Sequence, residues 1–202
     1  MKQTKIFLVL FILNIGVTYG QMDSLTLKIL DSIKVEDQKW RNLSHKVANG
    51  EIDTLTIAQI ITRVSEVDSL NYLIINDFFN RYGYLGYNKV GVISSHYFWL
   101  LVQHSDKHPD FQERVLDSMK IEASKGNSSM KDYAYLLDRV KVNTGKSQIY
   151  GTQMQYDSIN STYEPKPVEE PANLNMRRQE VGLCTIEDYI RIMNENYKPD
   201  KK

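Results

Sequence analysis

Two short stretches, far apart in the chain, place polar side chains that could do chemistry beside large apolar ones. Residues 99–106 contain His104, and residues 148–153 contain Tyr150 followed by Gly151 and Thr152. A histidine can exchange a proton near neutral pH, and a glycine lets the backbone approach a ligand closely. We expect the two stretches to meet in space and to line one pocket.

Acid–base chemistry is the first hypothesis for these residues. His104 ends an apolar helical face and could act as a general base if a carboxylate oriented its ring. Asp106 is too close in the sequence for that role, so Asp138 is the expected partner and Tyr150 the third catalytic residue. The alternative is that His104 is a core histidine bonded to a backbone carbonyl.

A second set of polar residues could bind a ligand. Arg177 and Arg178 are adjacent, and a guanidinium can bind a carboxylate or phosphate through a fork of hydrogen bonds. The alternative, slightly favoured, is an internal salt bridge from this pair to Asp106 or Asp138. The residues expected to bind a ligand are Gln103, Arg139, Thr152, Gln153, Arg177 and Arg178.

The spacing of the histidines argues against a metal site. His104 and His108 are four residues apart, but Pro109 breaks the helical register between them. The chain has no His-Glu-x-x-His pattern, no Gly-x-Ser-x-Gly elbow and no Walker loop. We therefore expect no metal and no cofactor.

Composition restricts the class of protein. The 25 basic residues equal the 25 acidic residues, which disfavours binding to nucleic acid or to an anionic membrane surface. A hydrophobic fraction of 42% can supply a core. The single cysteine, Cys184, cannot form an internal disulfide, and we expect it to be a small buried residue rather than a nucleophile.

The first 20 residues are typical of a secretory signal peptide. Lys2 and Lys5 precede an apolar run over residues 6–13, and cleavage is expected after Gly20. The run is shorter than the about 20 apolar residues of a membrane-spanning helix. We expect residues 21–197 to form a single helical domain, residues 198–202 to be a charged tail, and the protein to be exported, either periplasmic or secreted.

Hydrophobic periodicity predicts a mainly α fold, an irregular multi-helix domain with a small β-hairpin in the C-terminal third. Ser128 or Ser129, Pro109 and Thr185 are expected at helix starts. Helices are expected over residues 22–33, 40–49, 56–80, 93–104, 109–124, 129–143, 173–180 and 185–193, with a break possible at 67–69, and strands over 148–156 and 163–168.

Several blocks resemble a known family. They are Trp-Leu-x-x-Gln-His-x-Asp at 99–106, Asp-Arg-Val at 138–140, Tyr-Gly-Thr-Gln at 150–153 and Arg-Arg at 177–178. In order and spacing they are similar to the bacterial domain of unknown function numbered 6624. The resemblance implies a mainly helical domain and no particular activity. His108 stands where that family has an acidic residue, which favours a helix-capping role there.

Two classes of function follow from the sequence. In the first, the protein is an exported hydrolase that uses His104 as general base and Arg177 or Arg178 as an anion clamp. In the second, it is a non-catalytic, envelope-associated binding or structural domain, and its polar residues form a buried network. The expected partner is a small molecule or an envelope component, with no nucleic acid and no transmembrane segment after signal cleavage.

Overall fold

The polar triplet at residues 36–38 does not interrupt the first helix. In the computed structural model, which describes residues 24–196, one continuous helix α1 covers Ser24–Ala48. The prediction of two separate helices, over residues 22–33 and 40–49, is therefore wrong. Two side-chain pairs four residues apart support the helix across the triplet: Trp40 Nε1 donates to Glu36 Oε1 (2.6 Å), and Arg41 Nε donates to Asp37 Oδ1 (3.2 Å).

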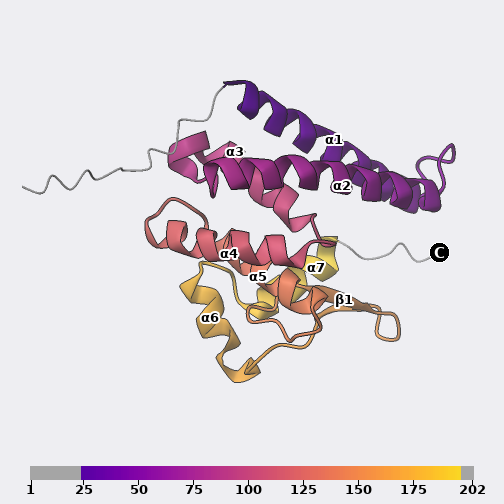
Figure 1. Ribbon diagram of the computed structural model, residues 1–202. Helices are drawn as coiled ribbons and strands as arrows, with labels where there is room; N and C mark the ends of the chain where they lie inside the picture. Colours follow the sequence, from indigo (N-terminus) through magenta and orange to yellow (C-terminus); the bar gives the residue numbers. More distant parts are fainter. Residues whose placement is uncertain (1–23, 197–202) are drawn as a thin grey trace, which may run out of the picture.

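Helix α2 (Ile57–Tyr82) is also unbroken, including at residues 67–69. It begins with a capping box, in which Gln59 N donates to Thr56 Oγ1 (3.2 Å) and Thr56 N donates to Gln59 Oε1 (2.8 Å). Figure 1 shows α1 and α2 running side by side, joined by a loop at one end. These two helices form one side of the molecule.

Helix α3 (Tyr87–Gln103) contacts four neighbouring helices, namely α1, α2, α4 (Pro109–Ser124) and α5 (Met130–Asn143). A non-helical residue, Gly91 (φ 76°), kinks it near its start. Ile93, which follows the kink, is 69% exposed.

Helices α4 and α5 begin at the residues expected from the sequence. Pro109 occupies the first turn of α4, with His108 at the N-cap position, and Ser129 caps α5 by accepting from Asp132 N (3.1 Å). His108 makes no side-chain cap hydrogen bond. Its ring instead stacks on Tyr72 of α2, with centroids 3.4 Å apart.

The predicted hairpin exists but is shorter than expected. Strands β1 (Met154–Asp157) and β2 (Thr162–Pro165) pair antiparallel, with Gln155 opposite Glu164. Before them, Gln148 forms an isolated parallel bridge with Val168. Two prolines in the returning segment limit how far a regular ladder can extend.

The remaining elements are a 3-10 turn, η1 (Pro171–Asn173), and helices α6 (Leu174–Glu180) and α7 (Ile186–Asn196). Thr185 lies just before α7, and its Oγ1 accepts from Asp188 N (3.2 Å), as expected of a cap. Cys184 is exposed, so the expectation of a buried thiol is wrong. Its carbonyl oxygen accepts a hydrogen bond from Arg178 Nε (2.6 Å), and its sulfur lies 3.9 Å from Arg178 Nη2.

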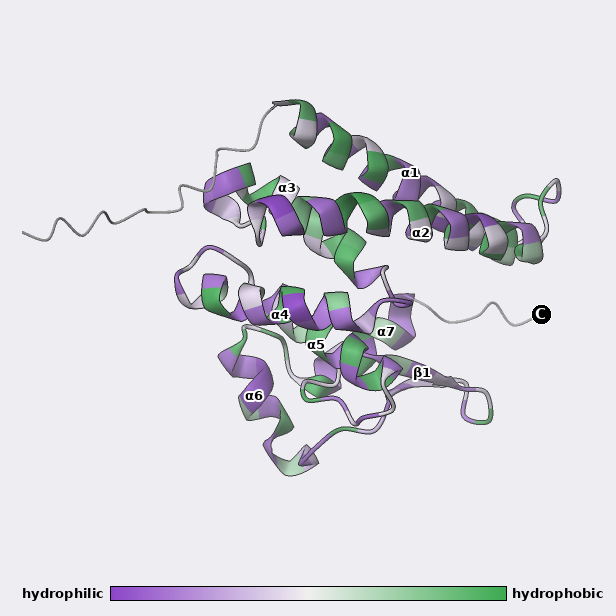
Figure 2. Ribbon diagram, viewed as in Figure 1, coloured by the Kyte–Doolittle hydropathy of each residue, from purple (hydrophilic) through white to green (hydrophobic). Residues whose placement is uncertain are grey.

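The core lies where α1, α2 and α3 meet α4 and α5. Figure 2 shows that the helices carry hydrophobic and hydrophilic residues along the same length, as amphipathic helices do. The largest fully buried apolar side chains are Leu30, Ile60, Ile75, Leu85, Phe98, Leu101, Met119 and Leu136.

Over residues 24–196, no helix is both long enough and apolar enough to cross a bilayer. The expected signal peptide, the first three positions of the expected mature chain and the expected charged tail all lie outside the described residues.

Candidate functional site

A cavity of about 470 Å³ lies where α1, α2 and the connection between α3 and α4 meet. Ile60, Ile61 and Val64 of α2 form its apolar wall. Its polar lining comes from Arg41 and His45 of α1, Ser65 and Asp68 of α2, and His104 to His108. The volume lies within the range of about 300–1,000 Å³ that is usual for small-molecule pockets.

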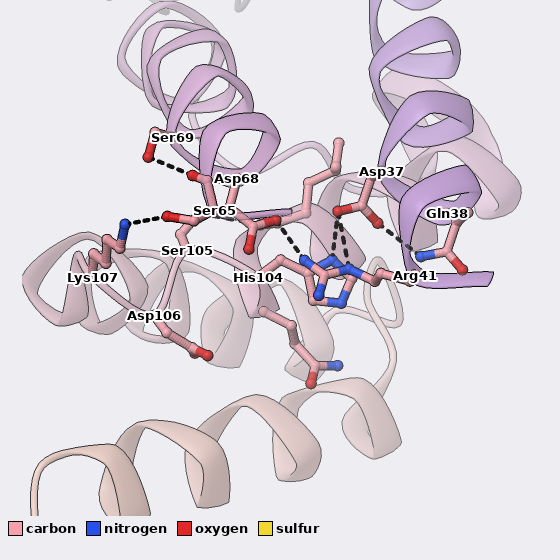
Figure 3. Close-up of polar contacts among 12 residues, drawn as sticks. Asp37, Gln38, Arg41, Ser65, Asp68, Ser69, His104, Ser105, Asp106 and Lys107 are labelled. Carbon is pink, nitrogen blue, oxygen red and sulfur yellow. Dashed lines mark hydrogen bonds and ion pairs between the residues drawn. The ribbon is translucent and has the colours of Figure 1, made fainter. Parts of the chain in front are cut away.

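The central polar contact joins residues 67 positions apart. Asp37 of α1 is fully buried, and its Oδ1 accepts a hydrogen bond from His104 Nδ1 at 2.9 Å (Figure 3). His104 is the C-cap residue of α3, and its side chain is 13% exposed. Because Asp37 engages Nδ1, Nε2 is the nitrogen left for a ligand, and it bonds to no atom of residues 24–196.

Arg41 connects this pair to a second carboxylate. Its Nε lies 3.2 Å from Asp37 Oδ1, and its Nη2 lies 2.5 Å from Asp68 Oδ1 on α2. Figure 3 shows Arg41 between the two carboxylates, beside the His104 ring. One guanidinium thus bridges the two helices and shares its single positive charge between two carboxylates.

The two carboxyl groups differ in their affinity for a proton. Burial acts to raise the pKa of Asp37, but the hydrogen bond from His104 and the nearby Arg41 outweigh it and hold the pKa below its usual value. At Asp68 burial prevails, so its pKa is raised although Arg41 partly offsets the effect. Asp68 lines the cavity, whereas Asp37 lies behind His104.

Asp37, Asp68 and His104 are also the described residues whose donor atoms could hold a metal ion. One atom from each lies within 4.8 Å of the other two. Arg41 already supplies a positive charge to both carboxylates, so a divalent cation would have to displace its guanidinium. The arrangement fits an Asp37–His104 pair held by Arg41 better than an open metal-coordination site.

The rim of the cavity carries two further contacts. Lys107 Nζ donates to Ser65 Oγ at 2.6 Å. Asp106 accepts a forked pair of bonds from Arg139, at 2.8 Å from Nε and 2.6 Å from Nη2, and a third from Asn143 Nδ2 at 2.9 Å. Arg139 is therefore engaged by Asp106, a residue of the cavity lining.

Asp138 lies in a second polar network. It is fully buried, and its Oδ1 accepts from the backbone N–H groups of Ile149 (2.7 Å) and Tyr150 (3.0 Å). Its Oδ2 accepts from both the N–H (2.9 Å) and the hydroxyl (3.0 Å) of Thr152. One carboxylate thus fixes the turn over residues 149–152, while the carboxylate that orients His104 is Asp37.

The two arginines hold the other side of the same turn. Arg178 is fully buried, and it donates from Nε to Cys184 O (2.6 Å) and from Nη1 to Tyr150 O (2.5 Å). Arg177 Nε donates to Ile149 O (3.0 Å). The salt bridges expected from this pair to Asp106 or Asp138 are wrong, because unpaired backbone carbonyls of the turn accept these bonds instead.

The remaining residues expected to form the site take part in local contacts. Gln153 donates from its backbone N to Gln148 Oε1 (2.8 Å) and from Nε2 to Thr152 Oγ1 (3.2 Å). Gln103 is buried, and its carbonyl accepts from Gln112 Nε2 (3.3 Å). Burial first, and then nearby Tyr133 and Asp138, raise the pKa of the Tyr150 phenol.

The structure thus separates the residues that the sequence analysis grouped. Asp138, Tyr150, Thr152, Gln153, Arg177 and Arg178 share one network around the turn, whereas His104 faces the cavity. Of the two stretches, only residues 99–106 contribute to the cavity lining.

Asp37, Arg41 and Asp68 were not among the site residues expected from the sequence. A signal for Asp37 existed: Ile29 and Ile33, which pack against the core, are four residues apart, and Asp37 continues that spacing. A carboxylate on the apolar stripe of a helix is buried on folding and needs a partner. Which residue supplies that partner depends on the packing of α1 on α3.

Comparison with known proteins gives a family without an activity. No curated protein and no solved structure matches the chain. The family of unknown function DUF6624 matches residues 30–202, which is most of the chain and includes Asp37, Arg41, Asp68 and His104. The chain therefore belongs to the DUF6624 family.

Proposed function

We propose that the protein is an exported hydrolase that binds a small molecule in the cavity beside His104. The observation that carries the proposal is the Asp37–His104 hydrogen bond of 2.9 Å at the wall of a cavity of about 470 Å³. A buried carboxylate that fixes one nitrogen of a histidine leaves the other nitrogen poised as a general base. The signal-like N-terminal residues support export.

In this proposal each residue of the cluster has one task. Asp37 holds the proton on Nδ1 of His104, so that the lone pair of Nε2 faces the substrate side. Nε2 takes a proton from a water molecule, the water oxygen attacks the electrophilic atom of the substrate, and the proton passes on to the leaving group. Arg41 keeps Asp37 ionised by balancing its charge.

A non-catalytic binding domain is the second proposal, and one observation favours it. Arg41 already pairs with both Asp37 and Asp68, so the cluster can serve purely to hold α1 against α2. In that case the cavity binds an envelope component without transforming it. Residues 148–153, Arg177 and Arg178 would then be structural, with their bonds fixing the C-terminal third.

A matched pair of histidine variants separates these proposals. His96 also pairs with an aspartate, Asp132 (3.2 Å), but lies outside the cavity lining and is half exposed. Hydrolysis of p-nitrophenyl esters, phosphates and glycosides is measured for the unmodified protein, His104→Gln and His96→Gln. A general base contributes about 10²–10⁴-fold, so His104→Gln should lose at least about a hundredfold in kcat while His96→Gln keeps its rate.

The same assay can reject catalysis. Equal rates for the two variants would remove His104 from the chemistry. If none of the p-nitrophenyl compounds is hydrolysed while the protein still binds small molecules saturably, the result supports the non-catalytic proposal. Thermal unfolding of both variants, recorded alongside, shows whether a lost rate reflects a lost fold.

A further inference from the structure

Around the cavity, the carboxylate acceptors are paired with arginines, whereas some donors on cationic side chains are not paired with an acceptor. Both carboxylates of the lining are already paired with arginines: Asp68 with Arg41, and Asp106 with Arg139. Asp37, behind His104, is paired twice. Each carboxylate near the cavity therefore contacts an arginine, with Asp37 and Asp68 sharing Arg41, and no carboxylate of the described lining is without such a contact.

Lys107 and Arg41, by contrast, have N–H donors that are not all bonded to acceptors of the described chain. Lys107 Nζ bonds to a neutral hydroxyl, Ser65 Oγ, and pairs with no carboxylate within residues 24–196. Arg41 uses Nε and Nη2 for the two aspartates, and no atom of the described chain accepts a bond from its Nη1. Both residues line the cavity. Free donors on cationic groups are what an anion requires.

The opposite wall has a different character. Ile60, Ile61 and Val64 present aliphatic side chains from successive turns of α2. Ile61 is 62% exposed, although a large aliphatic side chain gains free energy when a ligand covers it. A ligand that binds the cationic donors on one side and covers the aliphatic side chains on the other has an apolar body and one anionic group.

We propose that the cavity selects a small amphipathic monoanion, an aliphatic chain that carries one carboxylate-like group. Lys107 and Arg41 Nη1 bind the charged end, and Ile61 and Val64 of α2 contact the chain. The inference rests on the proposed function, because it names the ligand class of the same cavity. It replaces Arg177 and Arg178 as the expected anion clamp, since those arginines serve the turn at residues 149–151.

Isothermal titration calorimetry of the full chain with four probes tests this class: n-octanoate, acetate, 1-octanol and n-octylamine. Octanoate is expected to bind saturably and more tightly than the other three. Within a series from hexanoate to octanoate, each added methylene should tighten binding by about fourfold. Equal binding of 1-octanol or octylamine, or equal binding of acetate, would overturn the proposed class.

Lys107→Met should weaken octanoate binding by about fivefold, as expected for one partly exposed charge pair. Lys107→Arg should retain binding, and Lys120→Met, an exposed lysine of α4 outside the cavity, is the matched control. Identical affinities for Lys107→Met and Lys120→Met would also overturn the proposal. If His104-dependent hydrolysis is found but octanoate neither binds nor competes, the hydrolase survives and this inference falls. If octanoate binds as expected but no hydrolysis occurs, the inference survives without the enzyme.

Discussion

Replacing Asp138 with asparagine should destabilise the protein strongly. The carboxylate is fully buried and accepts from four donors, three backbone N–H groups and the Thr152 hydroxyl. An amide offers one acceptor oxygen, and its NH2 group would face at least two of those donors. Because hydrogen bonds to a charged group contribute about 1.5–3 kcal/mol each, and buried donors left unpaired cost more, we expect a loss of about 3–5 kcal/mol.

Urea unfolding followed by circular dichroism measures this loss, with the free energy of unfolding taken from linear extrapolation. Asp106→Asn is the matched control. Asp106 also accepts three hydrogen bonds, but its side chain is 41% exposed, so its loss should cost about 1 kcal/mol or less. Amide exchange at residues 149, 150 and 152 should accelerate in Asp138→Asn alone.

A clear result would refute this reasoning. If Asp138→Asn unfolds within about 1 kcal/mol of the unmodified protein, the carboxylate does not hold the turn. If the variant is equally stable yet loses hydrolytic activity, Asp138 has the catalytic role that the sequence alone suggests. Protection of the three amides would distinguish an intact turn from a rearranged one.

Three other properties follow from the structure. Because the folded-state pKa of Asp37 lies below its ordinary value, its carboxylate stabilises the fold fully at neutral pH, and this contribution is lost as the pH falls through the folded pKa. The stability difference between the unmodified protein and Asp37→Asn, from urea unfolding at several pH values, should therefore shrink below about pH 4 and would contradict the assignment if it grew. Gly86→Ala should cost about 1–3 kcal/mol by thermal unfolding, because the new Cβ would lie 2.8 Å from the backbone oxygen of Asn127; an unchanged midpoint would show that this contact relaxes freely. Cys184 should react with a thiol reagent such as dithionitrobenzoate without denaturant, and a thiol titrated only after unfolding would contradict its exposure.

Local sequence signals determined most of the helical architecture. Ser129 and Thr185 cap helices as expected, because their hydroxyls accept from backbone N–H groups within the next few residues, and Thr56, the expected boundary of the second long helix, does the same. Pro109 fixes the start of α4. The β-hairpin also lies in the predicted region, although its strands are shorter than the pattern indicated. Capping and turn geometry depend on neighbours in the chain, so one sequence suffices to find them.

The partners of the polar residues were decided only by the tertiary structure. Asp37 lies in a triplet that the sequence indicated as a helix break, yet it pairs with His104, 67 residues away. Asp138, expected beside that histidine, instead binds a turn 11 to 14 residues further along the chain. A charged side chain on an apolar face must find a partner when it is buried, but the sequence does not specify which helix brings that partner. The packing of α1 across α2 and α3 does, and with it the position of the cavity.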